Sequence, residues 1–178
     1  MVSYVPIPGN IGEMKTKPTQ YAARSLNAVG LQADIIIARS TTPLDAKRKE
    51  KIATFCNIVK EHVISAPDVK SVYDVPLNFE RDHFSEILIK LLSIKRERSG
   101  SGLESWKRFV KKSHNGRKVL KIAVVGKYFD SGDFVLSDAY ISVIEAVKFS
   151  AYVVKSKPEL TWFDSKEFET GEKPIAIL

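Results

Sequence analysis

The chain has 178 residues, of which 44% are hydrophobic and 28% are charged, as in ordinary globular domains. It holds no unbroken apolar run of membrane-spanning length, and its opening residues, MVSYVPIPGN, lack the charged start and apolar core of a signal peptide. We therefore expect a cytoplasmic protein without membrane contact. A single cysteine excludes an intramolecular disulfide and a cysteine-rich zinc site, and the three scattered histidines have no metal-ligand spacing.

Helices and strands are predicted to alternate from the first residues onward. Pro18 is suited to the first turn of a helix over residues 18–29, and Gly30 is a typical stop signal. The following run ADIIIARS, residues 33–40, is apolar over most of its length. Such a run is typical of a strand buried on both faces of a parallel sheet.

A second helix is predicted over residues 43–57, with an inner face formed by Ile52, Phe55 and Cys56. Two further elements follow, namely a short strand over residues 62–66 and an amphipathic helix over residues 83–94. The pattern up to this point is α/β.

The last third of the chain repeats the alternation. We predict a strand over residues 118–128, a helix over residues 137–154 capped by Ser137, and strands over residues 160–165 and 174–178. Strands that alternate with helices form βαβ units with parallel strands, so the fold class is α/β with two separate sheets.

The net charge of +7 is concentrated in one segment. Residues 90–121 hold eleven lysines and arginines and two acids. Within this segment, residues 93–118 read as a basic linker around one short helix that carries Trp106 and Phe109. A solvated linker and a contact for RNA or phosphate are both compatible with this charge. Sparse aromatic residues and the lack of a known RNA-binding motif make nucleic acid the weaker interpretation.

The run KTKPTQ, residues 15–20, precedes and begins the first predicted helix. The residue before Pro18 is held extended, so Lys15 and Lys17 lie just ahead of a helix N-terminus. Free N–H groups of Thr19 and Gln20, the helix dipole, the two ammonium groups and the hydroxyls of Thr16 and Thr19 can converge there on an anion such as a polyphosphate. The alternative is a capped helix with two solvated lysines.

Six blocks of the sequence resemble successive blocks of CTP synthase, in the family's order and at about its spacing. They are GEMKTKPTQ, DIIIARS, KIATFCN, VISAPDVKSVYDVPL, IAVVGKY and DAYISVIEAVK. The resemblance implies a ligase of pyrimidine biosynthesis, a homotetramer that aminates UTP to CTP. It uses ATP, Mg²⁺ and ammonia from glutamine.

The resemblance also implies a domain organisation. Residues 1–92 resemble the C-terminal part of the synthetase (amidoligase) domain, residues 93–118 are the basic linker, and residues 119–178 resemble the start of a flavodoxin-like class I glutaminase domain. Met1 falls in the middle of the family's pattern, so we expect a fragment.

Carried over position by position, the resemblance assigns residues to two nucleotides. The site for UTP, which also receives the inhibitor CTP, contains Lys15, Thr16, Lys17, Pro18, Thr19, Gln20 and Lys51. The site for ATP contains Arg39, Pro67, Asp68 and Val69, which follow strand ends, where open α/β sheets place ligands. Lys51 within KRKEK also fits a solvated helix face, and Asp68 also fits the cap of a β-turn. The family usually has lysine at the position of Pro67, so we expect backbone contacts there.

No catalytic residue is predicted in this chain. It contains no GxxxxGK[ST] phosphate loop and no acidic set that plainly holds Mg²⁺, so we expect the Mg²⁺ ligands outside it. Cys56 is expected to be a buried, inert thiol, and His62 and His83 to be surface or packing residues without partners. Two alternatives to an enzyme remain, namely a UTP/CTP-binding regulatory module without catalysis and an RNA-binding protein.

Overall fold

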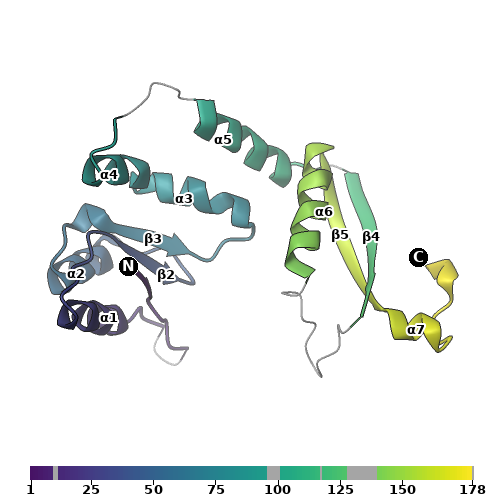
Figure 1. Ribbon diagram of the computed structural model, residues 1–178, viewed down its shortest axis with the longest axis horizontal. Helices are drawn as coiled ribbons and strands as arrows, with labels where there is room; N and C mark the ends of the chain where they lie inside the picture. Colours follow the sequence, from purple (N-terminus) through teal and green to yellow (C-terminus); the bar gives the residue numbers. More distant parts are fainter. Residues whose placement is uncertain (10–11, 96–100, 117, 128–139, 178) are drawn as a thin grey trace. The chain divides into compact units, whose positions relative to one another are not determined.

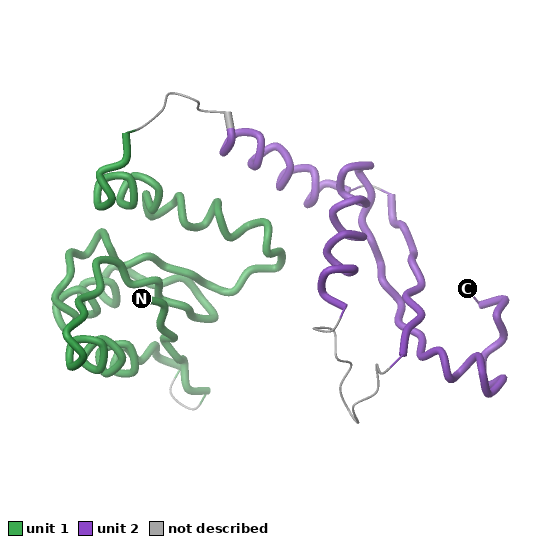
Figure 2. Tube along the Cα trace, in the orientation of Figure 1, with its two compact units in different colours: residues 1–98 green, residues 99–178 purple. Residues whose placement is uncertain are grey.

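The computed structural model describes residues 1–9, 12–95, 101–116, 118–127 and 140–177 (Figure 1). The chain divides into two compact units, residues 1–98 and residues 99–178, each with its own parallel sheet (Figure 2). This confirms the α/β class and the two separate sheets. Among the described helices, none has the length and apolar character needed to cross a membrane.

Unit 1 is built on a three-stranded parallel sheet in the order β1-β2-β3, formed by β1 (Val2–Tyr4), β2 (Ile36–Ser40) and β3 (Val63–Pro67). The central strand is the predicted apolar run, and its Ile36 and Ala38 are fully buried. Ile37 in β2 lies opposite Val2 on one side and Ile64 on the other. β1 was not predicted, because three residues at the edge of a sheet give little periodic signal.

Four α-helices flank this sheet. Figure 1 shows α1 (Lys17–Ala28) and α2 (Ala46–Cys56) on one side of the sheet, and α3 (Val75–Arg81) and α4 (Phe84–Leu91) on the other. Gly30, with φ +81°, ends α1 as predicted, since a positive φ favours glycine. Two 3₁₀ helices, η1 (Lys60–His62) and η2 (Val72–Asp74), and helix α3 were not predicted.

Helix α2 corrects one core assignment. Its buried residues are Ile52, Ala53 and Cys56, whereas Phe55 is 64% exposed. Successive residues of an α-helix are rotated by about 100°, so Phe55 lies about 60° from Ile52 on the side away from Ala53 and Cys56. Phe55 was therefore wrongly assigned to the inner face, because the apolar pattern alone did not fix the centre of that face.

Unit 2 contains a two-stranded parallel sheet. β4 (Lys118–Gly126) pairs with β5 (Ser156–Asp164) along their whole length, with Lys118 opposite Ser156. Helix α6 (Ile141–Val153) packs on β5, and the short helix α7 (Ser165–Glu169) directly follows β5 in the chain. The predicted cap Ser137 lies outside the described residues. The predicted strand over residues 174–178 is wrong, since its described part contains the 3₁₀ helix η4 (Ile175–Ile177).

Helix α5 (Ser101–His114) lies within the stretch expected to be a linker. It packs on α6, with the rings of Phe109 and Phe149 4.9 Å apart, and its Val110 is buried. The short helix expected within residues 93–118 is therefore present, and the assignment of this stretch as a linker stays a prediction. The assignment of the two units to synthetase and glutaminase domains stays a prediction.

Candidate functional site

The predicted site residues gather at the carboxyl end of the β1-β2-β3 sheet. The loop after β1 leads to Lys15, β2 ends with Arg39 and Ser40, and β3 ends at Pro67. Because the three strands are parallel, these three chain segments leave the sheet at the same edge. This is the edge at which open α/β sheets bind ligands.

The start of α1 is held by contacts among the KTKPTQ residues. The carbonyl of Thr16 accepts from the Gln20 N–H at 3.1 Å, and the Thr16 hydroxyl accepts from Gln20 Nε2 at 3.1 Å. The Lys15 N–H donates to the Pro6 carbonyl at 2.9 Å, which fixes the loop before the helix. Lys17 and Pro18 form the exposed first turn, so Lys17 lies inside the helix and was wrongly predicted to lie ahead of it. The prediction of a free Gln20 N–H is therefore wrong, because the Thr16 carbonyl accepts from it. Only N–H groups that precede Gln20 lack an acceptor four residues back in the helix and suit an anion.

Thr19 has a different position from the one expected. Its side chain is fully buried, and its hydroxyl accepts from Ser3 Oγ at 3.0 Å and donates to the Tyr4 carbonyl at 3.4 Å. The hydroxyl therefore ties α1 to β1. Because the whole residue is 0% exposed, Thr19 supports the helix start and the predicted hydroxyl contact with an anion is wrong.

A cluster of three cations lies beside this helix start, and we call Lys15, Arg48 and Lys51 around Glu13 the cation cluster. The Glu13 carboxylate lies 2.8 Å from Lys15 Nζ and 3.2 Å from the Arg48 guanidinium. The hydrogen bond and charge of Lys15, and then the charges of Arg48 and Lys51, hold the pKa of Glu13 below its usual value. Lys15 comes from the loop, and Arg48 and Lys51 come from α2, which packs against α1.

The cation cluster joins two predicted residues, Lys15 and Lys51, and adds two that sequence reasoning missed. Arg48 and Lys51 are three residues apart on α2, a spacing that puts both side chains on one side of the helix. That spacing was the available signal for Arg48. Glu13, within GEMKTK, had no separate signal, because nothing in the sequence shows which cations a carboxylate will meet.

The four residues predicted for ATP line one cavity of about 440 Å³. The Arg39 guanidinium donates to the Ala66 carbonyl at 3.0 Å and lies 2.8 Å from the Asp68 carboxylate. Asp68 thus pairs with Arg39, while Ser71 caps the following turn by accepting from the Tyr73 N–H. The complete lining is Arg39, Ala66, Pro67, Asp68, Val69, Val72, Val75, Asn78 and Phe79. Apolar walls with a few convergent polar groups are typical of ligand sites.

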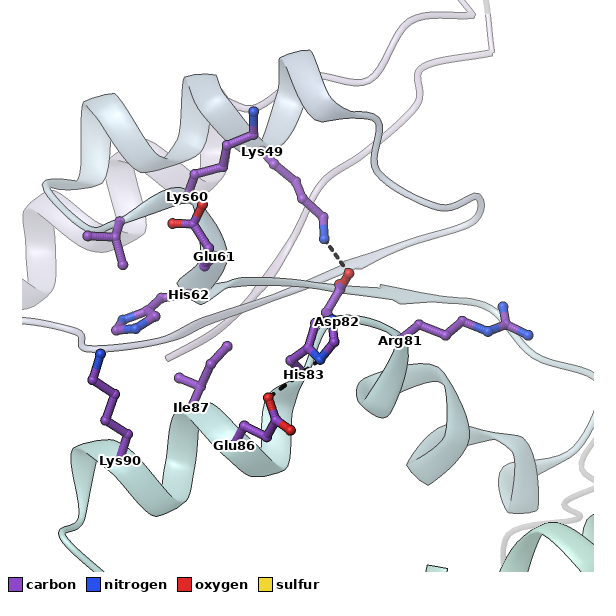
Figure 3. Close-up of a pocket in the computed structure, with 11 residues that line it drawn as sticks. Lys49, Lys60, Glu61, His62, Arg81, Asp82, His83, Glu86, Ile87 and Lys90 are labelled. Atoms are coloured by element: carbon purple, nitrogen blue, oxygen red, sulfur yellow. Dashed lines mark ion pairs between the residues drawn. The ribbon is translucent and has the colours of Figure 1, made fainter.

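A further cavity, of about 710 Å³, contains none of the predicted site residues (Figure 3). On one side of it, Lys49 of α2 reaches the Asp82 carboxylate at 2.6 Å. The other oxygen of Asp82 accepts from the Ser65 N–H of β3 at 2.7 Å. Asp82 therefore ties α2 to the sheet.

Two histidines also line this cavity and have partners, contrary to expectation. His62 Nδ1 lies 2.8 Å from the Asp34 carbonyl, and His83 Nδ1 lies 3.6 Å from the Glu86 carboxylate. The partners come from a distant turn and from the first turn of α4, respectively. Their geometry explains the side-chain positions and assigns no acid-base role.

Cys56 is buried, and burial raises the pKa of its thiol. The predicted burial is confirmed, and a raised pKa lowers the fraction of the nucleophilic thiolate. Within the described ranges, no group of three or more His, Cys, Asp or Glu side chains is placed to hold a metal ion.

Comparisons with known proteins show which sequences this chain resembles. The family model "CTP synthase N-terminus" matches residues 1–94. The CTP synthase of Nostoc punctiforme is 40% identical over 168 residues, that of Caldanaerobacter subterraneus is 41% identical over 166, and that of Methanococcus maripaludis is 35% identical over 169. These alignments cover 94%, 93% and 95% of this chain, respectively, and they extend beyond unit 1.

The chain spans about 30% of the length of each of these three relatives. The family model covers 94 of the 178 residues, and its match includes both groups of predicted site residues. The chain therefore belongs to the CTP synthase family.

Proposed function

We propose that this chain supplies nucleotide-binding residues of a CTP synthase, an ATP-dependent ligase that aminates UTP to CTP with glutamine as nitrogen donor. One observation carries the proposal. Residues assigned to two different nucleotides form two separate groups at the same edge of one parallel sheet. A two-nucleotide ligase needs this juxtaposition so that the donor phosphate and the acceptor base meet.

The first group binds the triphosphate of UTP or CTP. Lys15, Lys17 and Lys51 supply charge, and the first turn of α1 supplies backbone N–H groups. The side chain of Gln20, held by the Thr16 hydroxyl, lies one turn further along the helix. Thr16 and Thr19 support this surface from beneath, since both are buried.

The second group binds the ATP base in the 440 Å³ cavity. Val72 and Phe79 offer apolar surface for a flat ring, and backbone groups of residues 67–69 offer polar edges. Arg39 fixes this rim through its bonds to the Ala66 and Pro67 carbonyls. Pro67 keeps its backbone contact without a lysine side chain.

In the complete enzyme, ATP phosphorylates the uracil O4 and ammonia displaces that phosphate. The residues described here position the reactants. Among the described residues no group of three or more His, Cys, Asp or Glu side chains is placed to hold a metal ion, and we expect the Mg²⁺ ligands outside this chain. The proposal further places the enzyme in the cytoplasm as a homotetramer, with residues 1–92 in the synthetase domain and residues 119–178 at the start of the glutaminase domain.

Calorimetry with the 178-residue chain tests the proposal. Lys17→Ala should weaken the binding of UTP and CTP by about 1.5–3 kcal/mol, the value of a charge-assisted contact, and should leave ATP binding unchanged. Arg39→Ala should weaken ATP binding and leave UTP binding unchanged. Lys157→Ala, an exposed lysine of unit 2, is the charge-matched control. UTP affinity that is unchanged by Lys17→Ala would assign this lysine to a solvated helix start.

An assay of CTP formation separates binding from catalysis. With UTP, ATP and ammonium, we expect the chain alone to form no CTP, because phosphoryl transfer needs charge stabilisation that these residues do not provide. CTP formation above a Lys15→Ala control would contradict this. Binding without turnover, even in a protein of the relatives' full length, would favour a regulatory module.

A further inference from the structure

Glu13 lies inside a cluster of positive charge that the proposed function assigns to phosphate. Its carboxylate contacts Lys15 and Arg48 at 2.8 and 3.2 Å, and the charge of Lys51 also acts on it. Of the three cations, Arg48 has a second acidic partner, Asp45, at 2.6 Å. Two carboxylates thus face three cations.

The helix beside this cluster adds to its positive potential. α1 carries no acidic residue in its first turn, and Thr16 makes no side-chain capping bond to a backbone N–H there. The positive end of the helix dipole therefore lacks the acidic partner that many helices place in their first turn. Glu13 precedes this turn by a few residues and brings its negative charge to the cations instead.

We propose that Glu13 is an internal counter-anion of the nucleotide site, displaced by an incoming phosphate, and that Arg48 is a further phosphate-binding residue. The inference rests on the proposed function for the identity of the nucleotide. It adds a residue to the phosphate contacts and a carboxylate that competes for them.

The ion pair between Glu13 and Arg48 is partly exposed to solvent, so displacing the Glu13 carboxylate costs little free energy. The side chains of Glu13 and Arg48 are 53% and 25% exposed, and exposed ion pairs contribute little to stability. A phosphate group carries more charge and more acceptor oxygens than a carboxylate does, so it binds the same cations more strongly than Glu13 does. A ligand with a single negative charge gains less binding free energy from these cations. Glu13 therefore favours polyphosphates over singly charged anions.

Inorganic tripolyphosphate is the probe, because it tests the cation cluster without the nucleoside. In calorimetry at low ionic strength, Glu13→Gln should tighten tripolyphosphate binding by about two- to fivefold, the range for one exposed ion pair. Arg48→Gln should weaken it about tenfold, as expected for a lost charge-assisted contact. Glu172→Gln makes the same change of net charge at an exposed position in unit 2 and should have little effect.

Weaker or unchanged binding by Glu13→Gln would overturn the inference, since Glu13 would then position Lys15 or do nothing. No detectable binding by that variant would overturn it as well. Circular dichroism checks the fold, and Glu13→Asp, which keeps the charge but withdraws the carboxylate, is a second variant expected to tighten binding.

Comparison with UTP separates this inference from the proposed function. If tripolyphosphate binding responds as expected but UTP binds no better than tripolyphosphate, the inference holds and the nucleotide assignment fails. If Lys17→Ala weakens UTP while Glu13→Gln leaves tripolyphosphate unchanged, the nucleotide assignment holds and the inference fails.

Discussion

Replacing Thr19 with valine tests whether this residue holds the fold or binds the ligand. Valine keeps the shape of threonine and removes the hydroxyl, so no cavity forms in the buried site. The 3.0 Å bond from Ser3 is lost, and so is the weaker 3.4 Å bond to the Tyr4 carbonyl. A net intramolecular hydrogen bond contributes about 0.5–1.5 kcal/mol, so we expect the free energy of unfolding of unit 1 to fall by about 1–2 kcal/mol.

Urea denaturation followed by circular dichroism measures this loss, and a double-mutant cycle with Ser3→Ala isolates the bond between the two side chains. The coupling energy should be about 1 kcal/mol. UTP affinity should be unchanged at urea concentrations where the variant is folded, because the Thr19 hydroxyl is buried against Ser3 and Tyr4. A stable variant that loses UTP affinity would refute the reasoning and show that the hydroxyl reaches the ligand.

Three further predictions concern other parts of the chain. Gly116→Ala should lower the thermal stability of unit 2, because a Cβ there would lie 2.8 and 2.9 Å from backbone atoms of Ser156 and Lys157; a melting temperature equal to that of the parent chain would contradict this. Cys56 should react slowly with Ellman's reagent until urea unfolds unit 1, since burial raises its pKa, and rapid native-state reaction would show access that the fold does not provide. Limited trypsin digestion should cut first within residues 95–102, at the boundary between the two units, and a first cut within residues 34–40 would contradict the two-unit division.

Local sequence patterns predicted most elements of the fold. The apolar run around Ile36 predicted a central parallel strand, and Gly30 predicted the end of α1. Patterns failed where the signal was short or ambiguous. β1 and η4 span three residues each, which is too few to show a periodic pattern. A small rotation of α2 about its axis decides whether Phe55 lies on the buried or the exposed face of that helix.

For the candidate site, the sequence by itself determined which residues bear charge, the start of a helix within KTKPTQ to within one residue, and the resemblance to a family. These features depend on a few consecutive residues and their backbone preferences. The sequence also identified Arg39 and residues 67–69 as one group through that resemblance.

Only the tertiary structure decided what these groups contact. Lys15 and Lys51 are far apart in the sequence, and the packing of α1 against α2 brings both toward Glu13. The same packing adds Arg48 to the cluster, and the packing of α1 on β1 turns the Thr19 hydroxyl toward Ser3 and Tyr4. Charge and hydrogen-bond partners depend on distances of a few ångströms between side chains, and those distances are set by the burial of the apolar faces that join helix to helix and helix to sheet.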